Sequence, residues 1–315
     1  MKALLIGFVA VAAALLCCRI GVSSVPQVGP GRGFPSSAPW VSFYGSADKM
    51  GSLSRVARNF RIINIDADPG LQGFTPQQIA LLKGGGKNRV ISYLNLGAME
   101  TFRTYWSHVP AGFMSGKDNR AARRGAYEGY PDETWMDLGN AAYHHLVLDY
   151  IAPRLVAQGV DGFYLDNLEI VEHGPQDDNG PCSPSGRQGG LDLVRQLRQK
   201  YPKLLILMQN ATSPITRLGK TGGVSFPSLL DGISHEEVYA PHGSPDAQRE
   251  LKAWQRLKLS PGGRTFWIGT EDYVGSRAQI SAARAVYQKS RAQNFSPYVT
   301  DASAGQQKVF YWPFE

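Results

Sequence analysis

The chain has 315 residues, of which 43% are hydrophobic and 19% are charged, and its formal net charge is +7. This composition is typical of a globular protein and excludes a long disordered chain, and the length suits one large barrel or two ordinary domains. Basic residues cluster only in residues 117–124 (KDNRAARR), which lack aromatic side chains and are typical of a solvated loop, so we expect no nucleic-acid partner.

The N-terminus predicts export. Residues 3–16 form a nearly unbroken apolar run after one basic residue, which matches the central region of a secretory signal peptide and is short for a membrane span. We expect a signal peptide over residues 1–24, a Pro-, Gly- and Ser-rich linker over residues 25–39, and a secreted or periplasmic protein without stable membrane insertion once the signal is removed. A short membrane anchor, or a lipid on one of the two cysteines that follow the run, stays open as an alternative.

Removal of the signal peptide would change two further properties. Loss of Lys2 and Arg19 lowers the net charge from +7 to +5. Cys182 is then the single cysteine that remains in the sequence, so we expect no intrachain disulfide.

Strand-like and helix-like segments alternate after the linker. The expected strands are residues 40–45, 60–68, 89–97, 134–138, 160–169, 203–210, 229–237, 264–272 and 295–302. The expected helices are residues 53–59, 76–83, 140–158, 191–200, 246–257 and 277–292.

Continuous apolar strands separated by amphipathic helices indicate a parallel sheet that is covered on both faces. No Gly-rich dinucleotide-binding turn follows the first strand. The pattern therefore favours an α/β fold with a single domain, a (β/α)8 TIM barrel over residues 40–315. Nine candidate strands are one more than this barrel needs, and the sequence does not identify the extra one.

The candidate strands are apolar until their last residues, which are acidic or carry amides. These residues are Asp66 and Asp68, Asn95, Asp137, Asp166 and Asn167, Asn210, Glu236 and Glu237, and Glu271 and Asp272. In a (β/α)8 barrel the carboxyl ends of the strands share one face, where active sites lie. Any single residue of this set could cap a helix instead, but capping does not easily explain the whole ring.

A carboxylate-rich rim suits either a divalent metal or glycoside hydrolysis. A metal site would normally add several His or a tight Asp cluster, and the six His residues form no such motif, so we expect no metal and no cofactor. Glycoside hydrolysis needs two carboxyl groups, one protonated and one ionised. Aromatic residues near the rim, such as Tyr44 and Tyr93, suit a sugar-binding cleft.

Four stretches resemble the endo-α-1,4-polygalactosaminidase family, glycoside hydrolase family 114, and a related class of barrel proteins. They are VISYLNLGAMETFRTYW (90–106), GVDGFYLDNLE (159–169), MQNA (208–211) and DGISHEEVYA (231–240). The family pattern reads like YLSVGEAEDYRPYW where this chain has YLNLGAMETFRTYW, so Ala98 replaces the first Glu of the pattern. The resemblance runs from Trp40 to at least Glu271.

The resemblance implies a (β/α)8 barrel in which Asp166 and Glu236 are the catalytic pair. Asp166 would be the ionised carboxylate and Glu236 the general acid, selected over its neighbour Glu237 by the family spacing from Asp231. The residues expected to bind substrate are Tyr44, Asp66, Tyr93, Glu100, Arg103, Asn167, Asn210 and Glu271.

The expected partner is a polysaccharide, and the expected assembly is a monomer. A polymer of free galactosamine is cationic and would be attracted to a carboxylate rim, although the net charge of the whole chain is positive. Two alternatives stay open: a non-catalytic glycan-binding or envelope protein, which the loss of Glu at Ala98 makes credible, and a glycosidase that acts on another polysaccharide.

Overall fold

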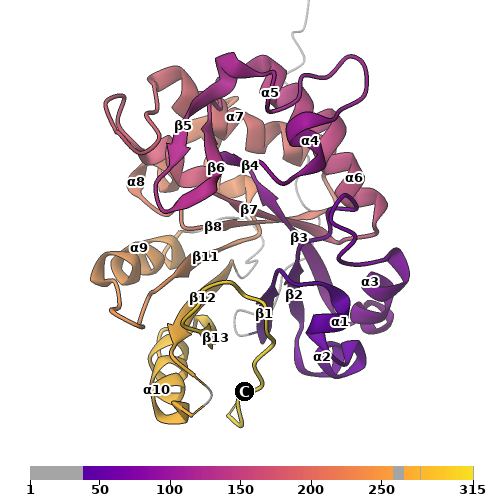
Figure 1. Cartoon of the computed structure of the whole chain (residues 1–315). Coiled ribbons are helices and arrows are strands. Elements are labelled where there is room, and N and C mark those ends of the chain that lie inside the picture. Colours follow the sequence, from indigo (N-terminus) through magenta and orange to yellow (C-terminus); the bar gives the residue numbers. More distant parts are fainter. Residues whose placement is uncertain (1–37, 258–265, 277, 315) are drawn as a thin grey trace, which may run out of the picture.

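The fold is a (β/α)8 barrel, as the alternating pattern predicts (Figure 1). The computed structural model describes residues 38–257, 266–276 and 278–314. Eight strands form one sheet in which the paired neighbours are parallel. In order of pairing they are β1 (Trp40–Phe43), β2 (Ile62–Ile65), β3 (Arg89–Asn95), β7 (Gly162–Asp166), β8 (Leu205–Gln209), β11 (Gly232–Glu236), β12 (Trp267–Val274) and β13 (Ser296–Asp301).

The prediction of a barrel strand at residues 134–138 is wrong, and this is the extra candidate. These residues belong to β6 (Tyr130–Met136), which pairs antiparallel with β4 (Ala98–Glu100) and β5 (Arg123–Tyr127). The three strands form a separate sheet between β3 and β7 in the chain, and Figure 1 shows it above these two strands. An antiparallel strand with one buried face is as apolar as a short barrel strand, so periodicity does not reveal which sheet it joins.

Asp137 consequently does not lie on the barrel rim. Its carboxylate pairs with Arg124 and accepts a hydrogen bond from the backbone N–H of Gly139 at 2.9 Å. It stabilises the turn that leads from β6 into the next helix.

The barrel interior is aromatic toward the amino ends of the strands. Trp40 packs against Trp267, Tyr298 and Tyr164, with ring centroids 5.2, 5.8 and 6.2 Å away. All four side chains are fully buried. This layer of rings fills the barrel and supports the polar layer that lies above it.

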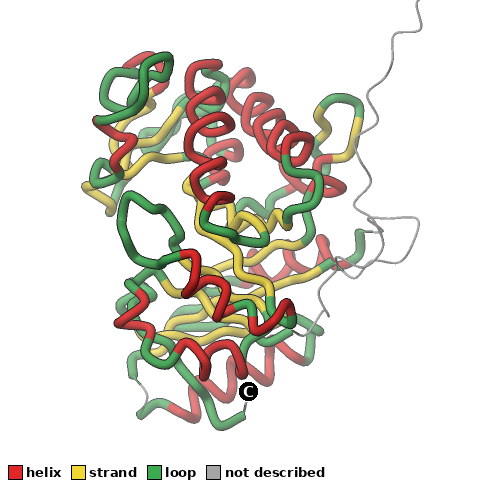
Figure 2. Tube along the Cα trace, turned by 90° about the vertical axis from the view of Figure 1, so that its right-hand side faces the viewer, coloured by secondary structure: helices red, strands yellow, loops and turns green. Residues whose placement is uncertain are grey.

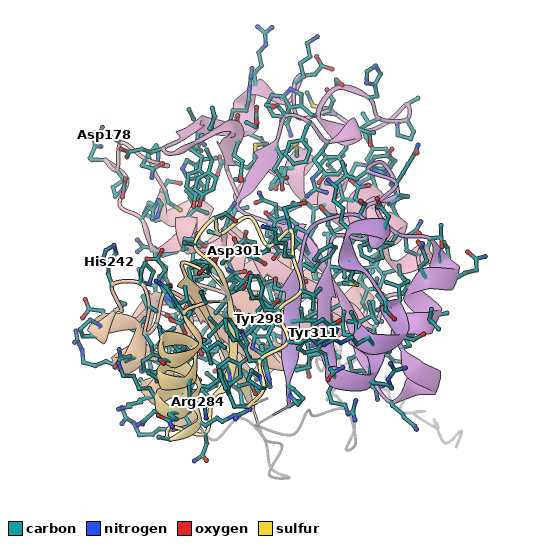
Figure 3. All side chains as sticks on the ribbon, turned by 60° about the horizontal axis from the view of Figure 1, so that its bottom comes forward. Asp178, His242, Arg284, Tyr298, Asp301 and Tyr311 are labelled. Carbon is teal, nitrogen blue, oxygen red and sulfur yellow. The ribbon has the colours of Figure 1, made fainter. Side chains whose placement is uncertain are left out.

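The seam between β1 and β13 is closed by side chains and by the C-terminal segment. Trp40 Nε1 donates a hydrogen bond to the Ser296 carbonyl at 2.8 Å, and the Tyr44 N–H donates to the Gln306 carbonyl at 2.9 Å. Figure 3 labels Tyr298 and Tyr311 where the yellow C-terminal part of the chain meets the violet N-terminal part. The barrel is therefore nearly closed by the sheet and completed by these contacts.

Helices and short turns connect the strands and cover the outside of the sheet, as the tube of Figure 2 shows from another side. The α-helices are α1 (Ala47–Met50), α2 (Leu53–Asn59), α3 (Pro76–Leu82), α4 (Thr104–Ser107), α5 (Ala141–Leu146), α6 (Ala152–Ala157), α7 (Pro184–Lys200), α8 (Pro214–Arg217), α9 (Pro245–Gln255) and α10 (Ile280–Arg291). A π-helical turn (Val147–Ile151) joins α5 to α6, so the long helix predicted at 140–158 is continuous.

The remaining elements are short. They are the 3₁₀ turns η1 (Gly84–Gly86), η2 (Arg120–Ala122), η4 (Leu168–Glu172) and η5 (Phe226–Leu229), and the two-stranded pair β9 (Lys220–Thr221) and β10 (Val224–Ser225).

Helix α7 begins at Pro184 instead of residue 191. Ser183 caps it by accepting a hydrogen bond from the Gly186 N–H at 3.0 Å. Glycines in the first turns lower the intrinsic helix propensity, which is why the sequence predicts a shorter helix. A Cβ on Gly189 would lie 2.1 Å from the Leu138 carbonyl oxygen, so close packing requires glycine here.

The predicted signal peptide and nearly all of the linker lie outside the described residues. Ala38, at the end of the predicted linker, is already buried in the core. Within the described part of the chain, the helices are all too short or too polar to cross a membrane.

Candidate active site

A cavity of about 410 Å³ opens at the carboxyl ends of the barrel strands. Nine of the ten predicted site residues line it: Tyr44, Asp66, Tyr93, Glu100, Arg103, Asp166, Asn167, Asn210 and Glu236. The tenth, Glu271, is fully buried and is not among the lining residues. Parallel strands of a barrel end on one face, which brings these distant parts of the chain together.

The backbone at the end of β7 fixes the position of Asp166. Its carbonyl accepts hydrogen bonds from the N–H groups of Leu96 at 2.9 Å and Gly97 at 3.4 Å. A Cβ on Gly97 would lie 1.7 Å from the Asn167 carbonyl oxygen, so no other residue fits here without a shift of the backbone. Asn167 itself has a left-handed backbone, with a φ of 59°. This conformation turns the chain sharply after Asp166.

The Asp166 carboxyl lies in an environment that favours its protonated form. Burial, followed by the charge of Glu236, raises its pKa from 3.8 to about 8, against the opposing hydrogen bonds of the Asn167 N–H and the Tyr93 side chain. The Asp166 carboxyl therefore favours its protonated form at neutral pH. The resemblance implied an ionised Asp166, whereas the free protein favours its protonated form.

The side chain of Asn210 holds Glu236 in place by contacting both the backbone and the carboxylate of Glu236. Asn210 Nδ2 donates to Glu236 Oε2 at 2.7 Å, and Asn210 Oδ1 accepts from the Glu236 N–H at 3.0 Å. The backbone of Asn210 is left-handed, with a φ of 61°, and its N–H donates to the Ser234 carbonyl. This tight turn at the end of β8 is what directs the amide at the neighbouring acid.

The strand ends at Glu236, and the next residue turns away. Glu237 has a left-handed φ of 51°, is exposed, and does not line the cavity. The hydroxyl of Tyr273 donates to Glu236 Oε1. Tyr273 does not stand out in the sequence, although it lies two residues after Glu271 in β12 and so shares the inward face of that strand.

Arg103 holds together three carboxylates on the opposite wall of the cavity. Its guanidinium pairs with Asp66 at 2.8 Å, Glu100 at 3.0 Å and Asp68 at 3.5 Å. All four side chains are at least nine-tenths buried. Burial raises the pKa of Asp66, and the charge of Arg103 opposes this rise. The positive charge of Arg103 therefore offsets part of the repulsion between these three carboxylates.

The antiparallel sheet supplies cavity residues that the sequence analysis missed: Tyr127, Tyr130 and Glu133. Burial raises the pKa of Glu133 to about 7, helped by the charge of Glu100 and opposed by hydrogen bonds from Asn95 and Asn167. These residues lie outside the barrel strands, so a search for polar strand ends does not find them. Leu71, Phe102, Gln209 and residues 304–307 complete the lining.

Glu271 lies beneath the cavity in the barrel interior. It is directly paired in register with Glu236, and among the described residues neither of its carboxyl oxygens has a hydrogen-bond partner. Burial, with the charges of Glu236, Asp272 and Asp166, raises its pKa well above the usual value. An unpaired charge at this depth is unfavourable, so the surroundings of Glu271 favour its protonated form.

In the described part of the chain, no group of three or more His, Cys, Asp or Glu side chains is arranged to hold a metal ion. Metal-independent activity stays a prediction from the sequence. Loss of turnover in EDTA, recovered with one divalent ion, would contradict it.

Comparison with known proteins gives a family and a fold. The profile described as glycoside-hydrolase family GH114 matches residues 35–313. An uncharacterized protein of Deinococcus radiodurans is 28% identical over 251 residues, covering 75% of this chain and 72% of that protein.

Two solved structures have the same fold at low identity. The glycoside hydrolase domain of PelA from Pseudomonas aeruginosa is 18% identical with a TM-score of 0.62, and the match covers 88% of this chain and all of that domain. Ega3 of Aspergillus fumigatus, solved in complex with galactosamine, is 16% identical with a TM-score of 0.59, covering 88% of this chain and 96% of Ega3.

Proposed function

The chain belongs to glycoside hydrolase family GH114 and is a glycoside hydrolase, and we propose that it cuts an α-1,4-linked, galactosamine-containing polysaccharide at internal linkages. The observation that carries this proposal is the cavity that both Asp166 and Glu236 line, in which the charge of Glu236 helps to raise the pKa of Asp166. Hydrolysis of a glycosidic bond needs two carboxyl groups, one to donate a proton and one to attack or stabilise the sugar cation.

In the proposed reaction, the proton held by the pair lies on Glu236 when the bond breaks. Since the free protein favours a protonated Asp166, binding of the sugar must be accompanied by transfer of this proton from Asp166 to Glu236. Glu236 then protonates the glycosidic oxygen while the Asp166 carboxylate attacks the anomeric carbon, and the C–O bond to the leaving sugar breaks.

A second step restores both acids. Glu236, now ionised, removes a proton from a water molecule, whose oxygen attacks the anomeric carbon and releases Asp166. The retaining course of this scheme follows from the family resemblance. The anomer of the first product, measured by NMR, tests it, because an inverted product would require a direct attack by water.

The charge of the cavity supports a cationic sugar. Five acidic residues line it, and Arg103 is the one Lys or Arg among the described lining residues. A negative cleft attracts the ammonium groups of a deacetylated amino-sugar polymer. The structure of Ega3 in complex with galactosamine points to the same class of substrate.

The rim of the cavity suits a long chain of sugars. Phe102 and Tyr130 are 57% and 54% exposed at the lining, and Leu71 is 38% exposed. Exposed rings beside a polar cleft are suitable platforms for the apolar faces of sugars. This open arrangement favours cleavage within a polymer over release of single terminal sugars.

Reducing-sugar release from partially deacetylated galactosaminogalactan tests the proposal, with chitosan and neutral glucans as comparisons. We expect release from the galactosamine polymer and production of oligosaccharides before monosaccharides. Release from chitosan or a glucan instead would assign another substrate. Binding of the polymer without release from any substrate would favour a non-catalytic role, the alternative raised by Ala98.

We also propose that the protein is secreted or periplasmic and acts as a monomer. The apolar run over residues 3–16 supports export. N-terminal sequencing of protein recovered outside the cytoplasm is expected to start after Leu16. Recovery of soluble protein that retains Met1 would contradict it.

A further inference from the structure

Glu133 enters the cavity from the separate antiparallel sheet. It lies on β6 directly opposite Glu100 of β4, and both residues line the cavity. Two carboxylates at directly opposed positions of neighbouring strands repel each other, because their Cβ atoms are only about 4.5–5.5 Å apart. Such a pair needs a compensating positive charge.

Among the described residues, an arginine contacts Glu100 directly and none contacts Glu133, although the charge of Arg103 also opposes the rise that burial causes in the pKa of Glu133. Arg103 pairs with Glu100 Oε1 at 3.0 Å but also serves Asp66 and Asp68. Glu133 forms no ion pair with a Lys or Arg among the described residues. Its donors are neutral amides, Asn95 Nδ2 and Asn167 Nδ2, each 3.0 Å from Glu133 Oε2.

Two carboxylate oxygens are consequently left without protein partners. Within the described residues, both amide donors reach Oε2 of Glu133 and none reaches Oε1. Oε2 of Glu100 is buried and also lacks a hydrogen-bond partner. Glu100 is 3% exposed and lines the cavity, so its negative charge acts on a ligand group that enters deeply. A small group with several N–H donors and a positive charge would suit this arrangement.

We propose that Glu133, supported by Glu100, recognises the free ammonium group of a galactosamine unit and so makes the enzyme select deacetylated over N-acetylated or neutral sugars. This rests on the proposed function for the substrate class. An ammonium group has three donors and one positive charge, so it can donate to Oε1 of Glu133 and relieve the repulsion between the two acids. A hydroxyl or an N-acetyl group brings no charge and leaves that repulsion in place.

The hairpin formed by β5 and β6 also provides a surface for the sugar ring. Tyr127 and Tyr130 flank its turn with ring centroids 4.7 Å apart, and both line the cavity. Aromatic faces also attract nearby cations. The inserted hairpin thus combines a carboxylate with two rings, whereas the barrel strands carry Asp166 and Glu236.

Glu133→Gln tests this inference, with Asp132→Asn as its matched control. The first change removes the charge but keeps the shape and the two amide contacts, and the second removes the same charge from the exposed neighbouring residue. Binding of galactosamine, galactose and N-acetylgalactosamine is measured by titration calorimetry. The wild type and the Asp132→Asn variant are expected to prefer galactosamine over galactose by roughly tenfold or more, and Glu133→Gln is expected to lose most of this preference.

Glu133→Asp separates recognition from a structural role. It keeps the charge on a shorter side chain, so part of the preference for galactosamine returns if recognition is ionic. A Glu133→Gln variant with wild-type preference would overturn the inference, as would a Glu133→Asp variant that loses preference as fully as Glu133→Gln.

Polymer cleavage by the wild type keeps this test distinct from that of the proposed function. Cleavage of the galactosamine polymer, with equal preference in wild type and Glu133→Gln, would reject the role of Glu133 alone. Absence of cleavage, with a preference for galactosamine that depends on Glu133, would reject the proposed reaction and support the recognition site.

Discussion

Strands β7 and β11 carry the same sequence pattern, and a comparison of them separates structural acids from site acids. An Asp-Gly pair stands at the start of each strand, and each strand ends in an acidic residue five positions after that Asp. The two stretches are DGFYLD (161–166) and DGISHE (231–236). At the amino ends, Asp161 and Asp231 each accept the N–H of a neighbouring strand at 2.9 Å. Asp166 and Glu236, at the carboxyl ends, line the cavity.

The glycines of the two patterns have the same function. A Cβ on Gly162 would lie 2.4 Å from the Leu205 carbonyl oxygen, and one on Gly232 would lie 2.6 Å from the Trp267 carbonyl oxygen. Glycine therefore permits the close approach of adjacent strands at both positions.

The two strands differ in how their acids are neutralised. Asp161 pairs with Lys83 at 2.9 Å in a partly exposed position, whereas Asp231 pairs with Arg198 at 2.6 Å with both side chains 1% exposed. At the other end, burial and the charge of Glu236 raise the pKa of Asp166, while Asn210 and Tyr273 donate to Glu236. The same residue pattern thus acquires its chemistry from its surroundings.

The largest expected effect is on catalysis. Asp166→Asn and Glu236→Gln should each lower kcat roughly a thousandfold or more, because each removes a group that the reaction requires. Glu236→Gln should be milder on substrates with good leaving groups, which need little protonation. Glu237→Gln is the control, and its kcat should match that of the wild type because Glu237 is exposed. Normal turnover of the polysaccharide by Asp166→Asn would reject the assignment.

The next largest effect concerns the acids at the amino ends. Asp231→Asn leaves the Arg198 charge buried without its partner and should lower the free energy of unfolding by about 3–5 kcal/mol. Asp161→Asn, at a partly exposed pair, should lower it by only about 1 kcal/mol. Urea unfolding of both variants measures the difference. Equal losses would show that burial does not distinguish the two strands.

The pH dependence of kcat/KM tests whether the acids at the carboxyl ends share a proton. Since the pKa of Asp166 is about 8, this carboxyl loses its proton above this pH, and kcat/KM should fall about tenfold for each further pH unit because the reaction uses that proton. Glu133→Gln, which removes another group that titrates near neutral pH, should keep this alkaline limb. Constant activity from pH 7 to 10 would contradict a shared proton.

The smallest effect concerns the stability contributed by Glu271, the register partner of Glu236. Its raised pKa means that above about pH 4.5 the folded protein keeps a proton that the unfolded chain releases. Its contribution to stability is therefore fully present at low pH and declines by at most about 1.4 kcal/mol per pH unit as the pH rises.

Glu271→Gln removes this titration. The difference in free energy of unfolding between the variant and the wild type should consequently grow in favour of the variant from pH 5 to pH 8. Urea unfolding at these two pH values measures it. A difference that does not change with pH would show that Glu271 is ionised in the folded protein.

Most barrel strands and the polar ring at their ends could be predicted from the sequence, because both depend on local patterns. Apolar runs such as residues 203–210 predict buried strands, and the acid or amide that ends a run falls on the shared face of the barrel. The same reasoning wrongly assigned residues 134–138 to the barrel, since a buried strand has the same pattern in either kind of sheet.

The residues that were missed depend on contacts between distant segments. Glu133 reaches the cavity because β6 pairs with β4, and Gln306 lines it because the C-terminal segment closes the seam beside β1. Neither position ends a barrel strand.

The sequence by itself determined the alternation of strands and helices, the acids at the strand ends and the resemblance to a glycoside hydrolase family, since each of these is encoded in short runs of residues. Tertiary structure alone decided which strand lies outside the barrel, that Glu133 lines the cavity, and that the surroundings of Asp166 raise its pKa. These outcomes depend on burial, on the charges of neighbouring groups and on left-handed turns at the strand ends, which exist only once distant segments have packed together.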